Sequence, residues 1–154
     1  MAKSILELTL NGQPRQDAVT DNTLLVDYLR EIIGHTGAKL GCDGGECGAC
    51  TVLVDGEPRL SCLSLATSCR GSAIETIEGV QSDDGLHPLQ TAFVEKGAIQ
   101  CGFCSSGMIL SGKRLLEKKP SPSEAEIRTA ISGNLCRCTG YQKIVEAIKS
   151  ESSG

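Results

Sequence analysis

The sequence predicts an α+β protein made of two small domains, with strands in the first half and helices in the second. Apolar and polar residues alternate through much of the first half, the period-two pattern that is typical of half-buried strands. In the second half, apolar residues recur every three or four positions, as they do on amphipathic helices. Each half also contains a set of four cysteines, and Cys69 is the ninth.

The first half begins with two predicted strands, over residues 4–10 and 13–19, joined by Asn11-Gly12. Asn-Gly between two alternating runs is the strongest short hairpin signal. A short helix is predicted over residues 24–33, where apolar residues recur at helical spacing before a glycine. Asp21, Asn22 and Thr23 offer oxygens to cap it, and its core face is expected to hold Leu24, Leu25, Tyr28, Leu29 and Ile32.

Three further strands are predicted over residues 51–54, 57–62 and 73–77, and Asp55-Gly56 forms the turn between the first two. A hairpin, a crossing helix and further strands follow one another in this order in a β-grasp ferredoxin domain. The order and the cysteine spacing described below together predict a plant-type ferredoxin domain of this fold for residues 1–78.

Residues 79–154 are predicted to form a small four-helix bundle, separated from the first half by a polar, glycine-bearing stretch over 79–86. His87-Pro88 begins the first helix, because proline suits a first turn. Ser123 and Glu126 form a capping-box pattern at the start of the third helix. The four helices are expected near residues 87–96, 104–118, 123–132 and 141–149, followed by a disordered tail over 150–154.

Composition and charge exclude several classes of protein. A domain of about 75 residues is only marginally stable on apolar burial alone and often needs further stabilisation, for example by a bound metal. The net charge of −4 gives no case for nucleic-acid binding, and no Lys/Arg run indicates a membrane surface. No apolar run is long enough to insert into a membrane, and Met1–Glu7 lacks the apolar core of a secretory signal. We therefore expect a cytoplasmic protein.

The first cysteine set comprises Cys42, Cys47 and Cys50, with Cys62 downstream. The spacing Cys-x4-Cys-x2-Cys followed by a fourth cysteine is that of plant-type [2Fe–2S] ferredoxins. The residues between these cysteines are mostly Gly or Ala. Small residues let the loop turn sharply and let backbone N–H groups approach the sulfurs, where hydrogen bonds tune the cluster.

The second set comprises Cys101 and Cys104, spaced Cys-x2-Cys, and Cys136 and Cys138, spaced Cys-x-Cys. Both pairs lie at ends of predicted helices. Helix N-termini present free N–H groups and partial positive charge, which suit an anionic cluster. Two complete sets of four thiolates therefore predict two [2Fe–2S] clusters.

Four thiolates also hold structural zinc, so a zinc-stabilised interaction module stays an alternative, although neither Cys-x4-Cys-x2-Cys nor Cys-x-Cys favours it. A disulfide scaffold requires an oxidising compartment, for which the sequence carries no signal. Cys69 belongs to neither set and is expected to be a small, buried apolar side chain.

Three segments, Gly41–Val52, Gln100–Cys104 and Gly133–Tyr141, resemble the iron–sulfur small subunit of the molybdenum hydroxylases, the xanthine dehydrogenase and aldehyde oxidoreductase family. The resemblance covers about residues 4–149. The sequence differs from the family pattern at Ser105-Ser106, where many relatives have Thr-Pro. Serine can cap the start of the helix there instead. Within the family, the stretches 8–12, 24–31 and 42–50 are most similar to the small subunit of 4-hydroxybenzoyl-CoA reductase.

The resemblance implies an electron-transfer subunit with no catalytic residues of its own. In the family, the helical domain holds its cluster beside the molybdopterin of a large subunit. Electrons pass through both clusters to FAD on a medium subunit of a heterotrimer, or to another acceptor such as a cytochrome. Gln100 matches a glutamine that touches the pterin, and Cys138 is the candidate for a cysteine near it. Substrates of such complexes are aldehydes, N-heterocycles, purines, CO or aromatic CoA thioesters.

Two interpretations stay open for several other features of the sequence. A free-standing two-cluster ferredoxin would carry the same cysteines. Arg137, between two expected ligands, either offsets cluster charge or forms a surface salt bridge. Phe103 either shields a cluster or joins the core, and Tyr141 is expected to pack at the start of a helix.

Overall fold

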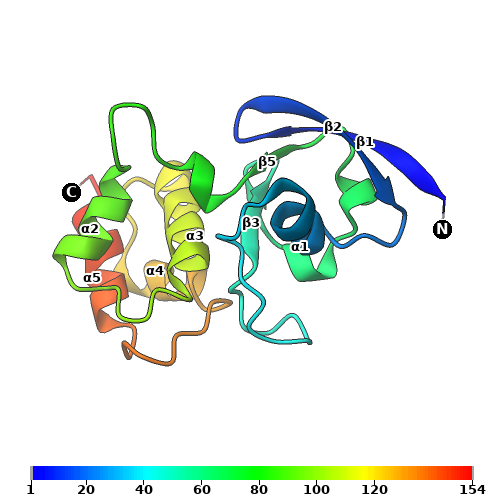
Figure 1. Cartoon of the computed structure of the whole chain (residues 1–154). Helices are drawn as coiled ribbons and strands as arrows, with labels where there is room; N and C mark the ends of the chain where they lie inside the picture. The colour runs from blue at the N-terminus through cyan, green and yellow to red at the C-terminus, as the bar shows by residue number, and fades with distance from the viewer. Residues whose placement is uncertain (1, 154) are drawn as a thin grey trace.

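The computed structural model describes residues 2–153, which form a sheet-containing part and a helical part side by side (Figure 1). The five strands are β1 (Lys3–Leu10), β2 (Gln13–Thr20), β3 (Thr51–Val54), β4 (Glu57–Leu60) and β5 (Ala73–Glu75). They form one sheet in the order β2-β1-β5-β3-β4. Strands β1 and β5 run parallel, and the other neighbours are antiparallel.

The predicted first hairpin is confirmed. Leu10 of β1 pairs with Gln13 of β2 across the turn, where Asn11 has a φ of 50° and Gly12 a φ of 78°. Two consecutive residues with positive φ define the turn type whose twist matches antiparallel strands. The alternation in β1 buries Leu6, Leu8 and Leu10.

The predicted helix over 24–33 forms as a short α-helix, α1 (Leu25–Asp27), that continues as a π-helix, η1 (Tyr28–Ile33). The helix ends at Gly34, as expected, with a φ of 83°. Two details of the prediction were wrong. No side chain caps this helix, because its N-cap residue is Leu24, which has no polar side-chain atom; the Thr23 hydroxyl is hydrogen-bonded to that of Thr20 at 2.9 Å instead. Ile32 is 48% exposed, because i→i+5 bonding changes the angular spacing of the side chains.

Two predicted strands are shorter in the structure. Strand β4 ends at Leu60 and a 3₁₀ turn, η2 (Ser61–Leu63), follows. The chain turns there because the Ser61 hydroxyl donates to the Cys50 carbonyl oxygen at 2.7 Å. Strand β5 ends at Glu75, two residues early. Two further 3₁₀ turns are η3 (Ala66–Cys69) and η4 (Ile77–Gly79).

The four predicted helices of the second half are confirmed as α2 (Pro88–Glu95), α3 (Ser105–Lys118), α4 (Glu124–Ala130) and α5 (Gln142–Ser150). The predicted capping box joins Ser123 and Glu126 at the start of α4. Helix α3 begins after Cys104 and has no side-chain cap, so the expected serine cap does not form. In α2, the His87 side chain accepts a hydrogen bond from the Leu89 N–H at 3.1 Å.

The expected disorder of the tail was wrong for the residues that the structure describes. The Ser153 N–H donates to the Pro120 carbonyl oxygen at 2.9 Å, and the Ser121 hydroxyl donates to the Ser153 carbonyl oxygen. Ser153, after the end of α5, is therefore held against the loop between α3 and α4. Gly154 lies outside the described residues.

Two clusters of buried apolar side chains lie on either side of the contact between sheet and helices. One is formed by the sheet and α1, and the other by α2–α5. Leu53 of β3 belongs to the helical cluster and is 1% exposed, and α3 is the helix that contacts β3 and β4. The predicted division between residues 78 and 79 stays a prediction. None of the helices in residues 2–153 has the length and apolar character needed to cross a bilayer.

Candidate metal centres

Cys42, Cys47 and Cys50 lie in the loop between η1 and β3, and Cys62 lies in the 3₁₀ turn η2 after β4. Cys42 Sγ accepts hydrogen bonds from the backbone N–H groups of Cys47 and Glu46, both at 3.4 Å. These two bonds lower the pKa of the Cys42 thiol to about 7, because they stabilise the thiolate. Gly45 in the same loop has a φ of 72°, a left-handed conformation that favours glycine. The predicted hydrogen bonding to sulfur is therefore present.

The four thiols of this set are arranged as two pairs. Cys42 and Cys47 are joined by the hydrogen bond from the Cys47 N–H to Cys42 Sγ, and the sulfurs of Cys50 and Cys62 lie 3.3 Å apart. Burial raises the pKa of the Cys62 thiol to about 12. A bound metal deprotonates such a thiol outright.

The second set is assembled from two segments of the helical part. Cys101 and Cys104 precede α3, and Cys136 and Cys138 precede α5. The sulfurs of Cys101 and Cys138 lie 3.4 Å apart, and burial, with the Cys136 side chain nearby, raises the pKa of the Cys104 thiol to about 12. The second set thus consists of two pairs as well, and each pair joins the two segments.

Pairs of thiols suit a two-iron cluster, in which four cysteines are divided between two irons. All nine cysteines are free thiols. The donor type, number and pairing therefore fit one [2Fe–2S] cluster in each set.

Two residues that the sequence analysis did not place at a site hold Cys136 and its loop. The Tyr141 hydroxyl oxygen accepts a hydrogen bond from the Cys136 N–H at 2.9 Å, so Tyr141 does more than pack at a helix start. Tyr141 has a φ of 71°, a sparsely populated conformation for a residue with a side chain. Thr139 donates its N–H to Cys136 Sγ at 3.4 Å.

The two cysteine loops are in direct contact. The Leu135 N–H donates to the Cys47 carbonyl oxygen at 2.8 Å, and a Cβ on Gly48 would collide with the Gly133 carbonyl oxygen. Phe103 lies over Gly41, since its ring carbon is 3.0 Å from where a Gly41 Cβ would stand. Phe103 is 43% exposed, so it covers the first loop rather than joining the core. Spacing along the chain gave no signal for any of these contacts.

The other candidate residues lie on the surface around the second set. Gln100, Cys101, Arg137 and Cys138 are all exposed in this chain. Within residues 2–153, no ion pair involves Arg137. Cys69 is 5% exposed, as predicted for a small apolar side chain.

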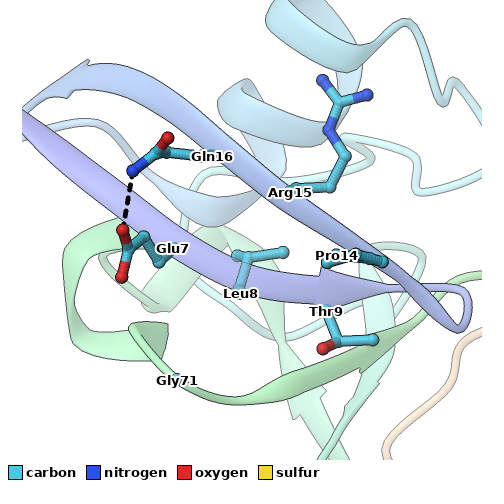
Figure 2. Close-up of a pocket in the computed structure, with 7 residues that line it drawn as sticks. All are labelled: Glu7, Leu8, Thr9, Pro14, Arg15, Gln16 and Gly71. Atoms are coloured by element: carbon cyan, nitrogen blue, oxygen red, sulfur yellow. Dashed lines mark hydrogen bonds between the residues drawn. The ribbon is translucent and has the colours of Figure 1, made fainter.

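A surface hollow of about 480 Å³ lies away from both cysteine sets, against the β1–β2 hairpin (Figure 2). Gln16 there donates to Glu7 at 2.6 Å, and Figure 2 shows Arg15 directed away from both. The residues that line it are Glu7, Leu8, Thr9, Pro14, Arg15, Gln16 and Gly71. None of them is a cysteine, so the hollow is separate from the candidate metal centres.

Comparison with known families agrees with the two-cluster interpretation. A 2Fe-2S iron-sulfur cluster binding domain matches residues 8–68, and a [2Fe-2S] binding domain matches residues 76–149. The fold and these matches define a two-domain iron–sulfur protein. They favour [2Fe–2S] clusters over structural zinc.

Curated relatives are similar over nearly the whole chain. The nicotinate dehydrogenase small FeS subunit of Eubacterium barkeri is 50% identical, over 97% of this chain and 95% of the relative. The nicotine 6-hydroxylase small subunit of Paenarthrobacter nicotinovorans is also 50% identical, over 93% of this chain and 86% of the relative.

Two solved structures have the same fold. Quinoline 2-oxidoreductase from Pseudomonas putida 86 has a chain that superposes with a TM-score of 0.95 at 45% identity, covering 99% of this chain and 94% of that one. Aldehyde oxidoreductase from Desulfovibrio desulfuricans ATCC 27774 gives a TM-score of 0.93 at 40% identity, over 99% of this chain but 17% of that longer chain. The chain therefore belongs to the family of iron–sulfur small subunits of the molybdenum hydroxylases.

Proposed function

We propose that this chain carries single electrons through two [2Fe–2S] clusters, from the molybdenum cofactor of a large partner subunit to an acceptor outside that subunit. The observation that carries the proposal is the contact between the two cysteine loops. Leu135, which donates to the Cys47 carbonyl oxygen at 2.8 Å, is the neighbour of Cys136. One hydrogen bond therefore links a cysteine of the first set to the backbone beside a cysteine of the second.

The ligands that we propose follow the observed pairs. Cys42 and Cys47 would share one iron of the first cluster, and Cys50 and Cys62 the other. In the second cluster, Cys101 would share an iron with Cys138, and Cys104 with Cys136. When bound, each cluster accepts and releases one electron at a time, so two clusters in series suit a partner whose reaction releases two.

The exposed face around the second set supports a large partner subunit there. Ile99, Phe103 and Leu135 are 38%, 43% and 55% exposed, although each lies within two residues of a proposed ligand. Exposed apolar side chains that gather beside a functional site are typical of a protein interface. We propose that the large subunit covers this face and that its pterin lies near Gln100 and Cys138.

The acceptor and the substrate depend on other subunits. We propose that electrons leave the first cluster to FAD on a medium subunit, with a cytochrome as the alternative acceptor, in a heterotrimer. The two curated relatives described above are subunits of nicotinate dehydrogenase and nicotine 6-hydroxylase. Chains this similar serve different substrates, so we place the choice of substrate on the large subunit and no catalytic residue on this chain.

Metal analysis and co-purification test the proposal. The chain, purified with whatever assembles with it, is expected to contain four irons and four acid-labile sulfides and to co-purify with a large molybdenum-containing chain. Two zincs in place of iron would contradict the clusters. A stable monomer that carries both clusters and binds no molybdenum chain would instead support the free-standing ferredoxin.

A further inference from the structure

We propose that Asn134 is a positioning residue that fixes the two cysteine loops against each other and so determines the rate of electron transfer between the two clusters. The inference rests on the proposed function, because it concerns the same two clusters. Asn134 is not a ligand and lies two residues before Cys136. It is 4% exposed, one of the few polar side chains buried in the described residues.

The Asn134 side chain uses both of its polar ends. Its Nδ2 donates to the Gly48 carbonyl oxygen at 3.0 Å and to Thr51 Oγ1 at 3.2 Å. Its Oδ1 accepts a hydrogen bond from the Ser111 hydroxyl at 2.9 Å. One amide therefore joins the first cysteine loop, helix α3 and the second cysteine loop.

These partners are placed beside proposed ligands of both clusters. Gly48 follows Cys47, and Thr51 follows Cys50. Ser111 lies on α3, the helix that begins directly after Cys104. A displacement of the amide would therefore move ligand-bearing segments of both clusters relative to each other.

The three segments approach so closely that a Cβ has no room between them. A Cβ on Gly107 of α3 would stand 2.6 Å from the Gly48 carbonyl oxygen and 2.7 Å from Asn134 Nδ2. At Gly48, with its φ of 71°, a Cβ would also stand 2.8 Å from Asn134 Nδ2. The glycines permit the approach, and the amide supplies the directed hydrogen bonds that select one arrangement.

The arrangement controls the hydrogen bond that joins the two loops. Asn134 precedes Leu135, whose N–H donates to the Cys47 carbonyl oxygen at 2.8 Å. If the amide is removed, the Ser111 hydroxyl loses its acceptor and the Gly48 carbonyl oxygen keeps only the donors of Thr51, so nothing on the Asn134 side holds the loop in place. We expect the separation of the clusters to change although all eight proposed ligands remain.

The test uses Asn134→Ala in the assembled complex, with Ser132→Ala as the matched control. Ser132 is an exposed residue of the same loop whose hydroxyl donates only to the Thr129 carbonyl oxygen. We expect Asn134→Ala to keep four irons, to weaken the magnetic interaction between the two reduced clusters in the EPR spectrum, and to slow electron transfer between them by about 10-fold, as for outer partners of metal ligands. The Ser132→Ala complex should match the unmodified one.

Thr51→Val provides a second variant in case Asn134→Ala fails to take up iron. It keeps the shape of the side chain and removes the oxygen that accepts from Asn134 Nδ2 and donates to the Gly48 carbonyl oxygen at 2.6 Å, so a change in the same direction is expected. A fully loaded variant with an unchanged magnetic interaction and an unchanged rate would overturn the inference. Absence of two clusters from the unmodified complex would instead overturn the proposed function, so the two failures are distinguishable.

Discussion

The two cysteine sets are built in different ways. Three ligands of the first set come from one loop of nine residues, Cys42–Cys50, whose backbone N–H groups already point at a sulfur. The second set takes two cysteines from each of two segments, one before α3 and one before α5, that the packing of the helical part brings together. The first site is thus determined mainly by local sequence, and the second by tertiary structure.

The largest effect is expected from removing one ligand of either set. Cys42→Ser and Cys104→Ser should each remove one cluster and abolish turnover, because the clusters work in series, while the large subunit stays bound or nearly so. Iron analysis and the EPR spectrum of each purified complex would show which cluster is lost. Turnover at the unmodified rate in either variant would show that its cluster is not on the electron path.

A second prediction concerns how far the sheet supports the second set. Leu53→Ala should destabilise the chain by about 3 kcal/mol, the usual cost of deleting a buried leucine side chain. Leu53 lies on β3 but packs in the core of the helices, so we expect the second cluster to be lost at lower temperature along with the sheet. Thermal unfolding followed by circular dichroism and by visible absorption tests this. Loss of helical signal at an unchanged temperature would show that the helical core does not depend on Leu53.

The difference between a site specified by neighbouring residues and a site assembled by tertiary packing also explains which features the sequence predicted. The hairpin at Asn11-Gly12, the capping box at Ser123 and the first cysteine loop were predictable, because each is specified by neighbouring residues. The π-helical turn that exposes Ile32 was not, since helical spacing alone does not distinguish α from π geometry. The contact of the two loops through Leu135 joins residues 88 positions apart, from 47 to 135, which no local pattern encodes.

A smaller effect is expected at Tyr141, which acts on the second set alone. Tyr141→Phe should leave the Cys136 N–H without its partner and destabilise that loop by about 1 kcal/mol, the typical contribution of one hydrogen bond. We expect the second cluster to be released faster to an iron chelator and the first at an unchanged rate. Equal acceleration for both clusters would contradict a local role for the hydroxyl.

The smallest effect is expected from an ion pair between the two parts of the chain. Lys113 of α3 lies 3.1 Å from Glu75 of β5 and 2.6 Å from Glu117. Burial lowers the pKa of Lys113, but hydrogen bonds from its ammonium to Glu117 and Glu75 outweigh this and raise the pKa above its ordinary value of 10.5.

Because the folded protein holds this proton more tightly, the stabilisation is complete below pH 10.5 and is lost as the pH rises through the raised value. Lys113→Gln should therefore cost about 0.5 kcal/mol at pH 7 and should flatten the loss of stability at alkaline pH. Urea unfolding of the unmodified chain and of Lys113→Gln at several pH values measures this. If the free energies of unfolding of the two proteins changed in parallel with pH above 10.5, the prediction would be contradicted.

Quantitative EPR of the dithionite-reduced complex tests the central claim most directly, because it counts and distinguishes reduced iron–sulfur centres. Two different thiolate environments, one in the sheet-bound loop and one between helices, should give two distinct [2Fe–2S] signals that each integrate to one spin per chain. A single type of signal, or none, from a complex with its full complement of subunits would contradict a two-cluster electron path.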